Sequence, residues 1–557
     1  MSRPFDHVEG SGVPERPDPS VVQPRLGLTG YLRFFWRQLT SMRTAIVLLL
    51  LLAVAAVPGS MWPQRSADPN GVIQFFDKNP TLAPVLDRIQ LFDVYTSVWF
   101  SAIYLLLFIS LIGCVLPRTI HHLRALRTKP PRTPARLERL EAMEFVELNA
   151  AELATADGTV VDAASAIDAA RSQLRASGYR VALYEGSGNL SVSAERGYLR
   201  ETGNLVFHTA LIGVLITVGL GGLFGFSGQK VIIEGQSFVN VKGAYDSFTP
   251  GRFFTDSTLQ PYRLTLNDFE AVYEEQNIRA YGQPIDYTAS VTTYLPGRAG
   301  TKGAIKVNEP LEVGDTQLYL LGNGYAPTIT VRDGNGNIAF TASVPFLPQD
   351  ANLTSTGVIR VPDALPQQLA FLAFFYPTAG ELKTGALTSI HPDLRNPVLT
   401  LFAYTGDLGL DSGIPQNVYA LDPTNLTQIA GGDSGTKALE LRPGQTVDLP
   451  NSLGTITFDS ASPKAPAGDW SQSVPRYVSL DVHHDPTQLW VLLFVILAVA
   501  GLLTSLFVPR RRVWVKAVEG KKGALRLEYA GLARGEDPHL AGAVSAIAAR
   551  HRERLKV

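Results

Sequence analysis

The sequence predicts a membrane protein with four transmembrane α-helices, a large β-rich extracytoplasmic domain and a small cytoplasmic α+β insert. Three observations predict this fold class. Apolar residues, 45% of the 557-residue chain, gather in four stretches that approach the about 20 residues needed to cross a bilayer core. Lysine and arginine gather at one side of these stretches, and the longest connection between them alternates polar and apolar residues as β-strands do.

The chain starts with a proline-rich leader, residues 1–26, which is expected to be disordered and cytoplasmic. Residues 27–43 are expected to form an amphipathic helix at the membrane interface. The first predicted span, 44–60, has arginines before it and small residues after it, as a cleaved signal peptide also has. The length of the leader and the amphipathic helix favour a span that is retained.

The remaining elements are predicted to alternate between spans and connections. In order they are a short outer loop at 61–94, a span at 95–116, the cytoplasmic α+β insert at 117–203, a span at 204–226, the β-rich extracytoplasmic domain at 227–487, a span at 488–508 and a cytoplasmic tail at 509–557.

Basic residues predict the orientation of these spans in a bacterial plasma membrane. Lysine and arginine are enriched on the cytoplasmic side, which places both termini in the cytoplasm and the large β-rich loop outside. Every basic cluster adjoins a membrane end, so attraction to the anionic lipid bilayer explains the clusters and nucleic acid is not an expected partner. The clusters comprise Arg33, Arg37 and Arg43; Arg118, Arg124, Arg127, Lys129, Arg132, Arg136 and Arg139; Arg196 and Arg200; and Arg510, Arg511, Arg512 and Lys516.

Two soluble segments have clear local patterns. In the insert, apolar residues from Ala164 to Leu174 recur at helical spacing, Gly178 is placed to end that helix, and residues 179–184 have the pattern of a strand. In the outer segment, "PTITVRDGNGNIAFTASVPF" predicts a β-hairpin, because alternating residues flank a turn-forming "DGNGN". We expect the outer domain to be a sandwich or a set of stacked sheets.

Motifs of the common enzyme classes are missing from the sequence. It has no HExxH, GxSxG or Walker loop, so hydrolytic and nucleotide-binding chemistry is not supported. Cys114 is the single cysteine, and without CxxC or CxxCH the chain is neither a thiol oxidoreductase nor a covalent haem carrier. No catalytic activity is expected of the chain alone.

Histidines are the remaining candidates, and most of them are expected to be structural or solvent-facing. Histidine near a helix C-terminus is common, and two histidines beside a span are more often structural than ligand-binding. The solvent-facing set is His7, His391, His539 and His551; His121 and His122 follow span two; His483 and His484 precede Asp485 and Pro486, which are expected to begin span four.

His208 differs because it lies inside the third predicted span. An ionisable residue there usually marks a functional pathway, although it can also serve only as a hydrogen bond between helices. Asn204, one turn earlier on the same helix face, is placed to hold one ring nitrogen and to fix which nitrogen is free. Glu201, two turns from His208, is expected in the lipid headgroups. A neutral imidazole in a dry pocket is a good axial ligand for haem iron, so His208 is the candidate metal ligand.

Several segments together resemble the ResB family, the membrane subunit of the System II cytochrome c synthase. The resemblance covers residues 37–514. One departure is Thr487, where a glycine commonly follows the Asp-Pro of the family pattern. The segments are "SMRTAIVLLLLLAVAAVPGSMWPQ"; "LFDVYTSVWFSAIYLLLFISLIGCVLPR", with Asp93, Ser97, Trp99, Phe100, Cys114 and Arg118; "ERGYLRETGNLVFHTALI", with Phe207 and His208; "VNEPLEVGDTQLYLLGNGYAPTITVRDGNG"; and "VHHDPTQLWVLLFVILAVAGLLTSLFVPRRRVW".

The resemblance implies that His208 is one axial ligand of haem b in transit through the membrane. The second ligand is then supplied by a ResC or CcsA-like partner, which carries a Trp-rich WWD segment that this sequence lacks. Haem is handed outward for covalent attachment to apocytochrome c, and nearby thiol-reducing proteins prepare that substrate.

Two alternatives remain open from the sequence. The chain can be a membrane-anchored assembly or chaperone protein that holds apocytochrome or the partner, with a structural His208. A sensor or transporter is disfavoured because polar residues in the spans are sparse.

Overall fold

The computed structural model describes residues 27–149, 152–153, 161–186, 189–410, 421–466, 468–520 and 524–555. The predictions for the leader, including His7, lie outside the described residues. The chain divides into two compact units. The first unit comprises Met1–Gln64, Gly71–Leu215 and Leu492–Val557, and the second unit comprises Arg65–Asn70 and Ile216–Val491.

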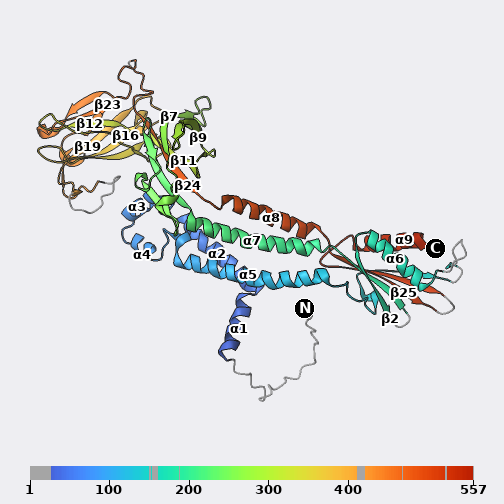
Figure 1. Ribbon diagram of the computed structural model, residues 1–557. Coiled ribbons are helices and arrows are strands. Elements are labelled where there is room, and N and C mark those ends of the chain that lie inside the picture. Colours follow the sequence, from blue (N-terminus) through green and yellow to red (C-terminus); the bar gives the residue numbers. More distant parts are fainter. Residues whose placement is uncertain are drawn as a thin grey trace. The chain divides into compact units, whose positions relative to one another are not determined.

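Four of the described helices are long and apolar enough to cross a membrane, in agreement with the four predicted spans. Two of them are longer than the apolar stretches suggest: α5 continues past residue 116 and α7 starts before residue 204. Leucine, alanine and arginine are good helix formers, so the helices extend into their basic flanks. The four helices are α2 (Met42–Met61), α5 (Val98–Arg127), α7 (Leu199–Phe224) and α8 (Gln488–Phe507), labelled in Figure 1.

The N-terminal amphipathic segment forms α1 (Leu28–Leu39), separated from α2 by a short turn. The hydroxyl of Ser41 accepts a hydrogen bond from the backbone N–H of Thr44 at 3.2 Å and caps α2. Large apolar side chains of α1, among them Phe35 and Trp36, are exposed. This pattern suits a helix that lies in a membrane interface.

The connection between α2 and α5 is largely helical. Phe92 is fully buried there and packs against Phe75, with 5.4 Å between the ring centroids. The predicted short loop therefore has a small core of its own. Its elements are α3 (Pro69–Lys78), α4 (Ala83–Arg88) and the 3-10 turn η1 (Val94–Thr96).

The first unit also contains an antiparallel sheet in the order β1–β26–β25–β3–β2. The sequence predicts a tail separate from the insert, but the structure places two strands of that tail between strands of the insert. Insert and tail therefore form one α+β domain. Its elements are the 3-10 turn η2 (Leu137–Arg139), β1 (Ala142–Leu148), α6 (Ala163–Ala176), β2 (Arg180–Gly186), β3 (Asn189–Arg196), β25 (Arg511–Glu519), β26 (Leu525–Ala533) and α9 (Leu540–Leu555).

Helices α6 and α9 cover one face of this sheet. Ile167 of α6 and Val544 of α9 share a buried cluster with Val515 of β25. The adjacent Trp514 belongs to a separate buried cluster, because successive strand residues point to opposite faces. After α6 the chain turns at Gly178, whose φ of +77° is the left-handed conformation that glycine adopts most easily, as predicted.

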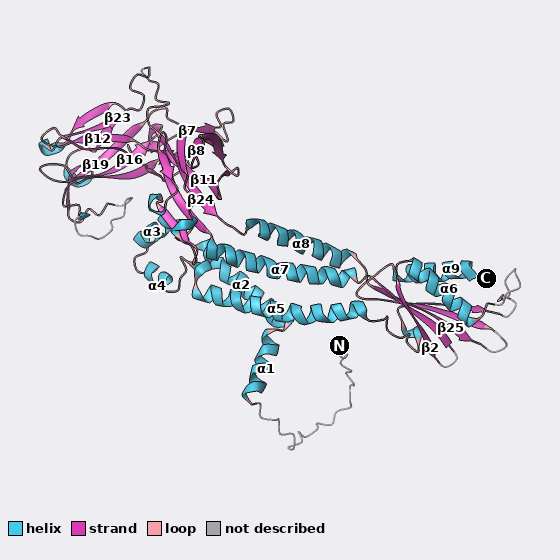
Figure 2. Cartoon of the chain, in the orientation of Figure 1, coloured by secondary structure: helices cyan, strands magenta, loops and turns pink. Residues whose placement is uncertain are grey.

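The second unit is rich in β-strands, coloured magenta in Figure 2, and its named strands pair antiparallel. One sheet contains β10 (Leu311–Val313), β11 (Thr316–Tyr325), β24 (Arg476–His484), β4 (Phe226–Ile233) and β6 (Ser247–Pro250), and another contains β5 (Ser237–Val239), β7 (Arg263–Tyr273), β8 (Pro284–Tyr294) and β9 (Thr301–Lys306). A third contains β13 (Ile338–Ser343), β12 (Thr328–Arg332), β23 (Thr455–Asp459) and β22 (Gln445–Asp448). A fourth contains β14 (Leu347–Pro348), β15 (Ser355–Val361), β16 (Leu369–Tyr376), β19 (Val398–Gly406), β20 (Leu426–Ala430) and β21 (Leu439–Leu441), and β17 (Ala379–Glu381) pairs with β18 (Leu387–Ser389).

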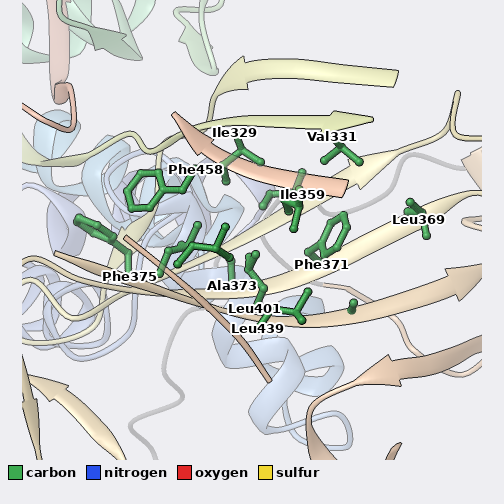
Figure 3. Packing of buried hydrophobic residues seen from close by; sticks show 14 of the residues in the cluster. Ile329, Val331, Ile359, Leu369, Phe371, Ala373, Phe375, Leu401, Leu439 and Phe458 are labelled. Atoms are coloured by element: carbon green, nitrogen blue, oxygen red, sulfur yellow. The ribbon is translucent and has the colours of Figure 1, made fainter. Parts of the chain in front are cut away.

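The largest core of the second unit lies between two of these sheets. Ile329 and Phe458 come from the β12–β23 sheet, and Phe371 and Leu401 come from the β16–β19 sheet; the four side chains meet in one buried cluster (Figure 3). The predicted hairpin is confirmed, because β12 pairs with β13 and Ile329 lies opposite Ala342. Stacked sheets are thus the architecture here, as the alternating pattern predicts.

Candidate functional site

His208 lies near the start of α7, in the first unit. Its Nδ1 is 2.8 Å from the backbone carbonyl oxygen of Asn204. A carbonyl oxygen only accepts, so in the neutral ring Nδ1 carries the proton and Nε2 carries the lone pair. The ring is half-buried and packs edge-on against Phe207, with ring centroids 5.0 Å apart. This tautomer leaves Nε2 able to bind a metal.

Asn204 holds the imidazole through its main chain. The sequence predicts that Asn204 holds a ring nitrogen of His208, and the structure assigns the contact to the carbonyl oxygen of Asn204. In an α-helix the carbonyl group of one residue lies beside the residue four positions later, so the helix itself supplies this acceptor. The side chain of Asn204 is exposed and points to a cavity instead.

A cavity of about 820 Å³ opens at this end of the spans, with its whole lining in the first unit. On α7, Glu201, Asn204 and Leu205 line it. Residues three and four apart share a helix face, so His208 continues the lined face toward the middle of the span. The other walls come from α5, α8 and the ends of β25 and β26. The lining residues are Pro117, Arg118, His121, His122, Ala125, Arg200, Glu201, Asn204, Leu205, Ser505, Arg510, Arg512, Arg534 and Gly535.

Glu201 is a counter-ion in the wall of the cavity. Its carboxylate forms ion pairs with Arg510 and Arg534 and lies 3.3 Å from Nδ1 of the buried His122. His122 belongs to α5, whereas Arg510 directly precedes β25 and Arg534 directly follows β26. Glu201 therefore ties α7 to the α+β domain.

Glu195 on β3 is a second, more deeply buried counter-ion, with 3% of its side chain exposed. It accepts hydrogen bonds at 3.0 Å from Nε of Arg510 and of Arg512, which lies opposite it in the sheet register. The Tyr198 hydroxyl donates to it at 2.7 Å. Burial alone raises the pKa of Glu195, but the hydrogen bonds from Tyr198 and Arg510 and the charge of Arg512 outweigh burial and hold the pKa below its usual value.

Two arginines of the cavity have no carboxylate partner within the described chain. Arg118 on α5 donates to the sulfur of Met42 at 2.6 Å, and sulfur is a weak acceptor. Arg200 on α7 donates to the backbone carbonyl of Arg534. Five arginines line the cavity, and among the described residues only Glu195 and Glu201 form ion pairs with any of them. The cavity therefore carries excess positive charge.

The predictions of solvent exposure fail for His391 and His551. His551 is fully buried, with Nε2 2.8 Å from the carbonyl oxygen of Ala166 and Nδ1 2.8 Å from the hydroxyl of Tyr529. Burial lowers its pKa. His391 is 2% exposed and packs against two tyrosine rings. Their positions in a loop and a tail misled the prediction, whereas His539 is exposed as predicted.

The two histidines before α8 differ in their surroundings. His483 is exposed on β24. His484 stacks on Phe226, with ring centroids 5.4 Å apart, and its Nδ1 lies 2.7 Å from the carbonyl oxygen of Asp315. These contacts hold the His484 ring between β4 and the loop before β11.

Asp485 shapes the entry to α8, in line with its predicted role. Its carboxylate accepts from the backbone N–H of Thr487 at 2.8 Å and lies 2.7 Å from the Thr487 hydroxyl. That hydroxyl is also 2.9 Å from the carbonyl oxygen of Thr217 on α7. Thr487, the departure from the family pattern, thus adds a contact between α7 and α8 that glycine lacks.

The side chains around His208 fit a haem as cargo. Nε2 of His208 accepts no hydrogen bond from the described residues. A haem iron can bind such a nitrogen through its lone pair. The adjacent cavity of about 820 Å³ falls within the range of about 300–1,000 Å³ found for cofactor and small-molecule sites. One imidazole would supply one axial position of a bound haem iron.

The described residues therefore define a membrane protein with four candidate spans, a β-rich unit, an α+β domain built from two chain segments, and a histidine in a span beside a basic cavity. Comparison with known families matches residues 42–545 to the ResB-like family. The match covers most of the chain, and the chain belongs to that family.

Curated relatives are similar over most of their own length. Cytochrome c biogenesis protein CcsB of Synechococcus sp. (strain WH7803) is 25% identical over 436 residues, 77% of this chain and 84% of that protein. The protein of the same name from Thermosynechococcus vestitus is 25% identical over 408 residues, 68% of this chain and 82% of that protein. That from Microcystis aeruginosa is 24% identical over 413 residues, 69% of this chain and 83% of that protein.

Proposed function

We propose that this chain acts in cytochrome c biogenesis as the ResB-like subunit of a System II synthase, and that His208 holds haem during its passage across the membrane. The observation that carries the proposal is the tautomer of His208, which donates from Nδ1 to the Asn204 carbonyl and keeps Nε2 open. Membership of the ResB-like family and the similarity to proteins named cytochrome c biogenesis protein CcsB support it.

In this proposal the chain's own residues bind and orient the cargo. The Asn204 carbonyl sets the rotation of the imidazole, and Phe207 packs against it with the two ring planes nearly perpendicular. The second axial ligand comes from a ResC or CcsA-like partner with a WWD segment. Both termini and the α+β domain lie in the cytoplasm, and the β-rich unit lies outside, where apocytochrome c receives the haem.

The test is haem retention by the full chain purified with its partner. We expect His208→Ala to remove most of the Soret absorbance of the complex, and imidazole in the buffer to restore it, because free imidazole replaces the lost axial nitrogen. His483→Ala, a change at an exposed histidine outside the spans, is the control and should retain haem as the wild type does. Equal haem in the wild type and His208→Ala complexes would contradict the proposal and favour the assembly-protein alternative.

A further inference from the structure

The basic cavity beside His208 has a charge that the ion pairs of the protein do not neutralise. Three of its arginines, Arg510, Arg512 and Arg534, are held by carboxylates. Arg118 and Arg200 have only a thioether sulfur and a backbone carbonyl as partners within the described chain. Two guanidinium groups that face one cavity without counter-ions indicate a ligand with anionic oxygens.

We propose that Arg118 and Arg200 bind the two propionate carboxylates of the haem whose iron His208 ligates; this inference rests on the proposed function. Haem is a flat apolar ring with two carboxylates at one edge. Carboxylates are costly in the apolar core of a membrane, so that edge turns to the water-facing end of the span that holds the iron.

The helix geometry is compatible with this assignment. Arg200, Asn204 and His208 follow one another at intervals of four residues on one face of α7. Arg200 lies about 12 Å from His208 along the helix axis, given a rise of about 1.5 Å per residue. Arg118 reaches the same cavity from α5. Each arginine can offer two parallel N–H donors to one carboxylate, which matches two arginines to two propionates.

The experiment compares haem with its dimethyl ester, in which the iron and the ring are unchanged but both carboxylates are blocked. The full chain with its partner is titrated with each compound in detergent, and binding is followed by Soret absorbance. We expect the wild type to bind the diacid at least roughly tenfold more tightly than the diester, because charge-assisted hydrogen bonds are lost.

The double variant Arg118→Gln with Arg200→Gln should bind the diacid roughly tenfold more weakly, and bind the diester as the wild type does. The matched control is Arg124→Gln with Arg127→Gln, which removes the same charge from exposed positions on α5 that do not line the cavity. Arg118 and Arg200 are chosen because neither holds Glu195 or Glu201, so their replacement leaves the buried ion pairs intact. An unfolding temperature close to that of the control shows that the double variant is folded.

The outcomes separate the two proposals. If the wild type binds diacid and diester equally and His208→Ala loses both, His208 is a haem ligand and the arginine proposal is wrong. If His208→Ala binds both compounds as the wild type does, the proposed function fails, and a weaker affinity of the double arginine variant for the diacid still supports the cavity as a carboxylate site. If the double variant keeps its haem affinity and instead loses bound phosphatidylglycerol, the cavity holds a lipid headgroup and the arginine proposal is overturned.

Discussion

A main-chain atom fixes the tautomer of the His208 imidazole, and this explains why the sequence could single out His208 and Asn204 but not the atom of Asn204 that makes the contact. An ionisable side chain within an apolar run is visible in the sequence alone. The acceptor, the carbonyl oxygen of Asn204, is present for any amino acid at that position. The ion pairs around the cavity were also invisible in the sequence, because Glu195 and Arg510 are 315 residues apart.

Replacement of Glu195 tests the buried ion pairs and their pH dependence. We expect Glu195→Gln to cost about 3–5 kcal/mol of the stability of the α+β domain at neutral pH, because Arg510 and Arg512 lose a buried counter-charge. The pKa of Glu195 is lowered in the folded state, so its contribution is present above the usual glutamate pKa of about 4.3 and is lost as the pH falls through the lower folded value. The difference between wild type and variant should therefore shrink below about pH 4.

Hydrogen exchange of peptides from β3 and β25 measures this difference without interference from the rest of the chain. The control is Glu553→Gln at an exposed position on α9. It should leave hydrogen exchange of these peptides unchanged both at neutral pH and below about pH 4. A difference between wild type and Glu195→Gln that stays constant from neutral to acid pH would contradict the assignment of Glu195 as an ionised partner.

At the scale of elements, the spans were predictable because each depends on a local run of apolar residues, and their ends were not. Helix α5 passes the last apolar residues and carries Arg118 and His122 within its final turns. A boundary drawn by hydrophobicity places both residues in a loop. The cavity is built partly from these helical extensions. The site therefore lies where hydrophobicity gives the least information on where a helix ends.

The crossing of α7 and α8 depends on glycines. A Cβ atom added at Gly501 would lie 2.6 Å from the backbone nitrogen of Phe207 and 2.7 Å from the carbonyl oxygen of Gly203. Backbone atoms cannot move aside as a side chain can, so Gly501→Ala should push the helices apart at a cost of about 1–3 kcal/mol. Thermal unfolding in detergent measures the cost.

The matched control for this crossing is Gly222→Ala, also within a span helix, where an added Cβ meets nothing within 4 Å. It should be neutral or stabilising by up to about 1 kcal/mol, because alanine favours helix over glycine. Equal unfolding temperatures for Gly501→Ala and Gly222→Ala would show that the two backbones are not in contact at this point.

At the scale of the whole molecule, the pairing between insert and tail was not predictable, since strand partners far apart in sequence leave no local pattern. Only the structure shows that β25 and β26 fill the middle of the sheet. The error on His551 has a related reason, because its partners Ala166 and Tyr529 belong to α6 of the insert and to β26.

A pair of neighbouring substitutions on α9 tests whether insert and tail are one folding unit. Val544 is 1% exposed and faces the sheet, so Val544→Asp buries a charge and should cost several kcal/mol, at least about 3. Ser545→Asp adds the same charge on the exposed face and should change stability by less than about 0.5 kcal/mol. In Val544→Asp, hydrogen exchange should accelerate in β1 and β3 as well as in β25 and β26. Retained protection of β1 and β3 would mean that the insert folds without the tail.

The strand order of this sheet also sets when the domain can be completed during synthesis. Its edge strands β1 and β2 leave the ribosome early, but the two strands that join β1 to β3 are made only after the β-rich unit and the last span. In a chain that stalls or is cut short before residue 511, β1 and β3 keep unpaired edges. Such edges can pair with other chains, so the product is prone to aggregation and proteolysis. Closure of this sheet therefore requires that synthesis has passed β26, which ends at Ala533.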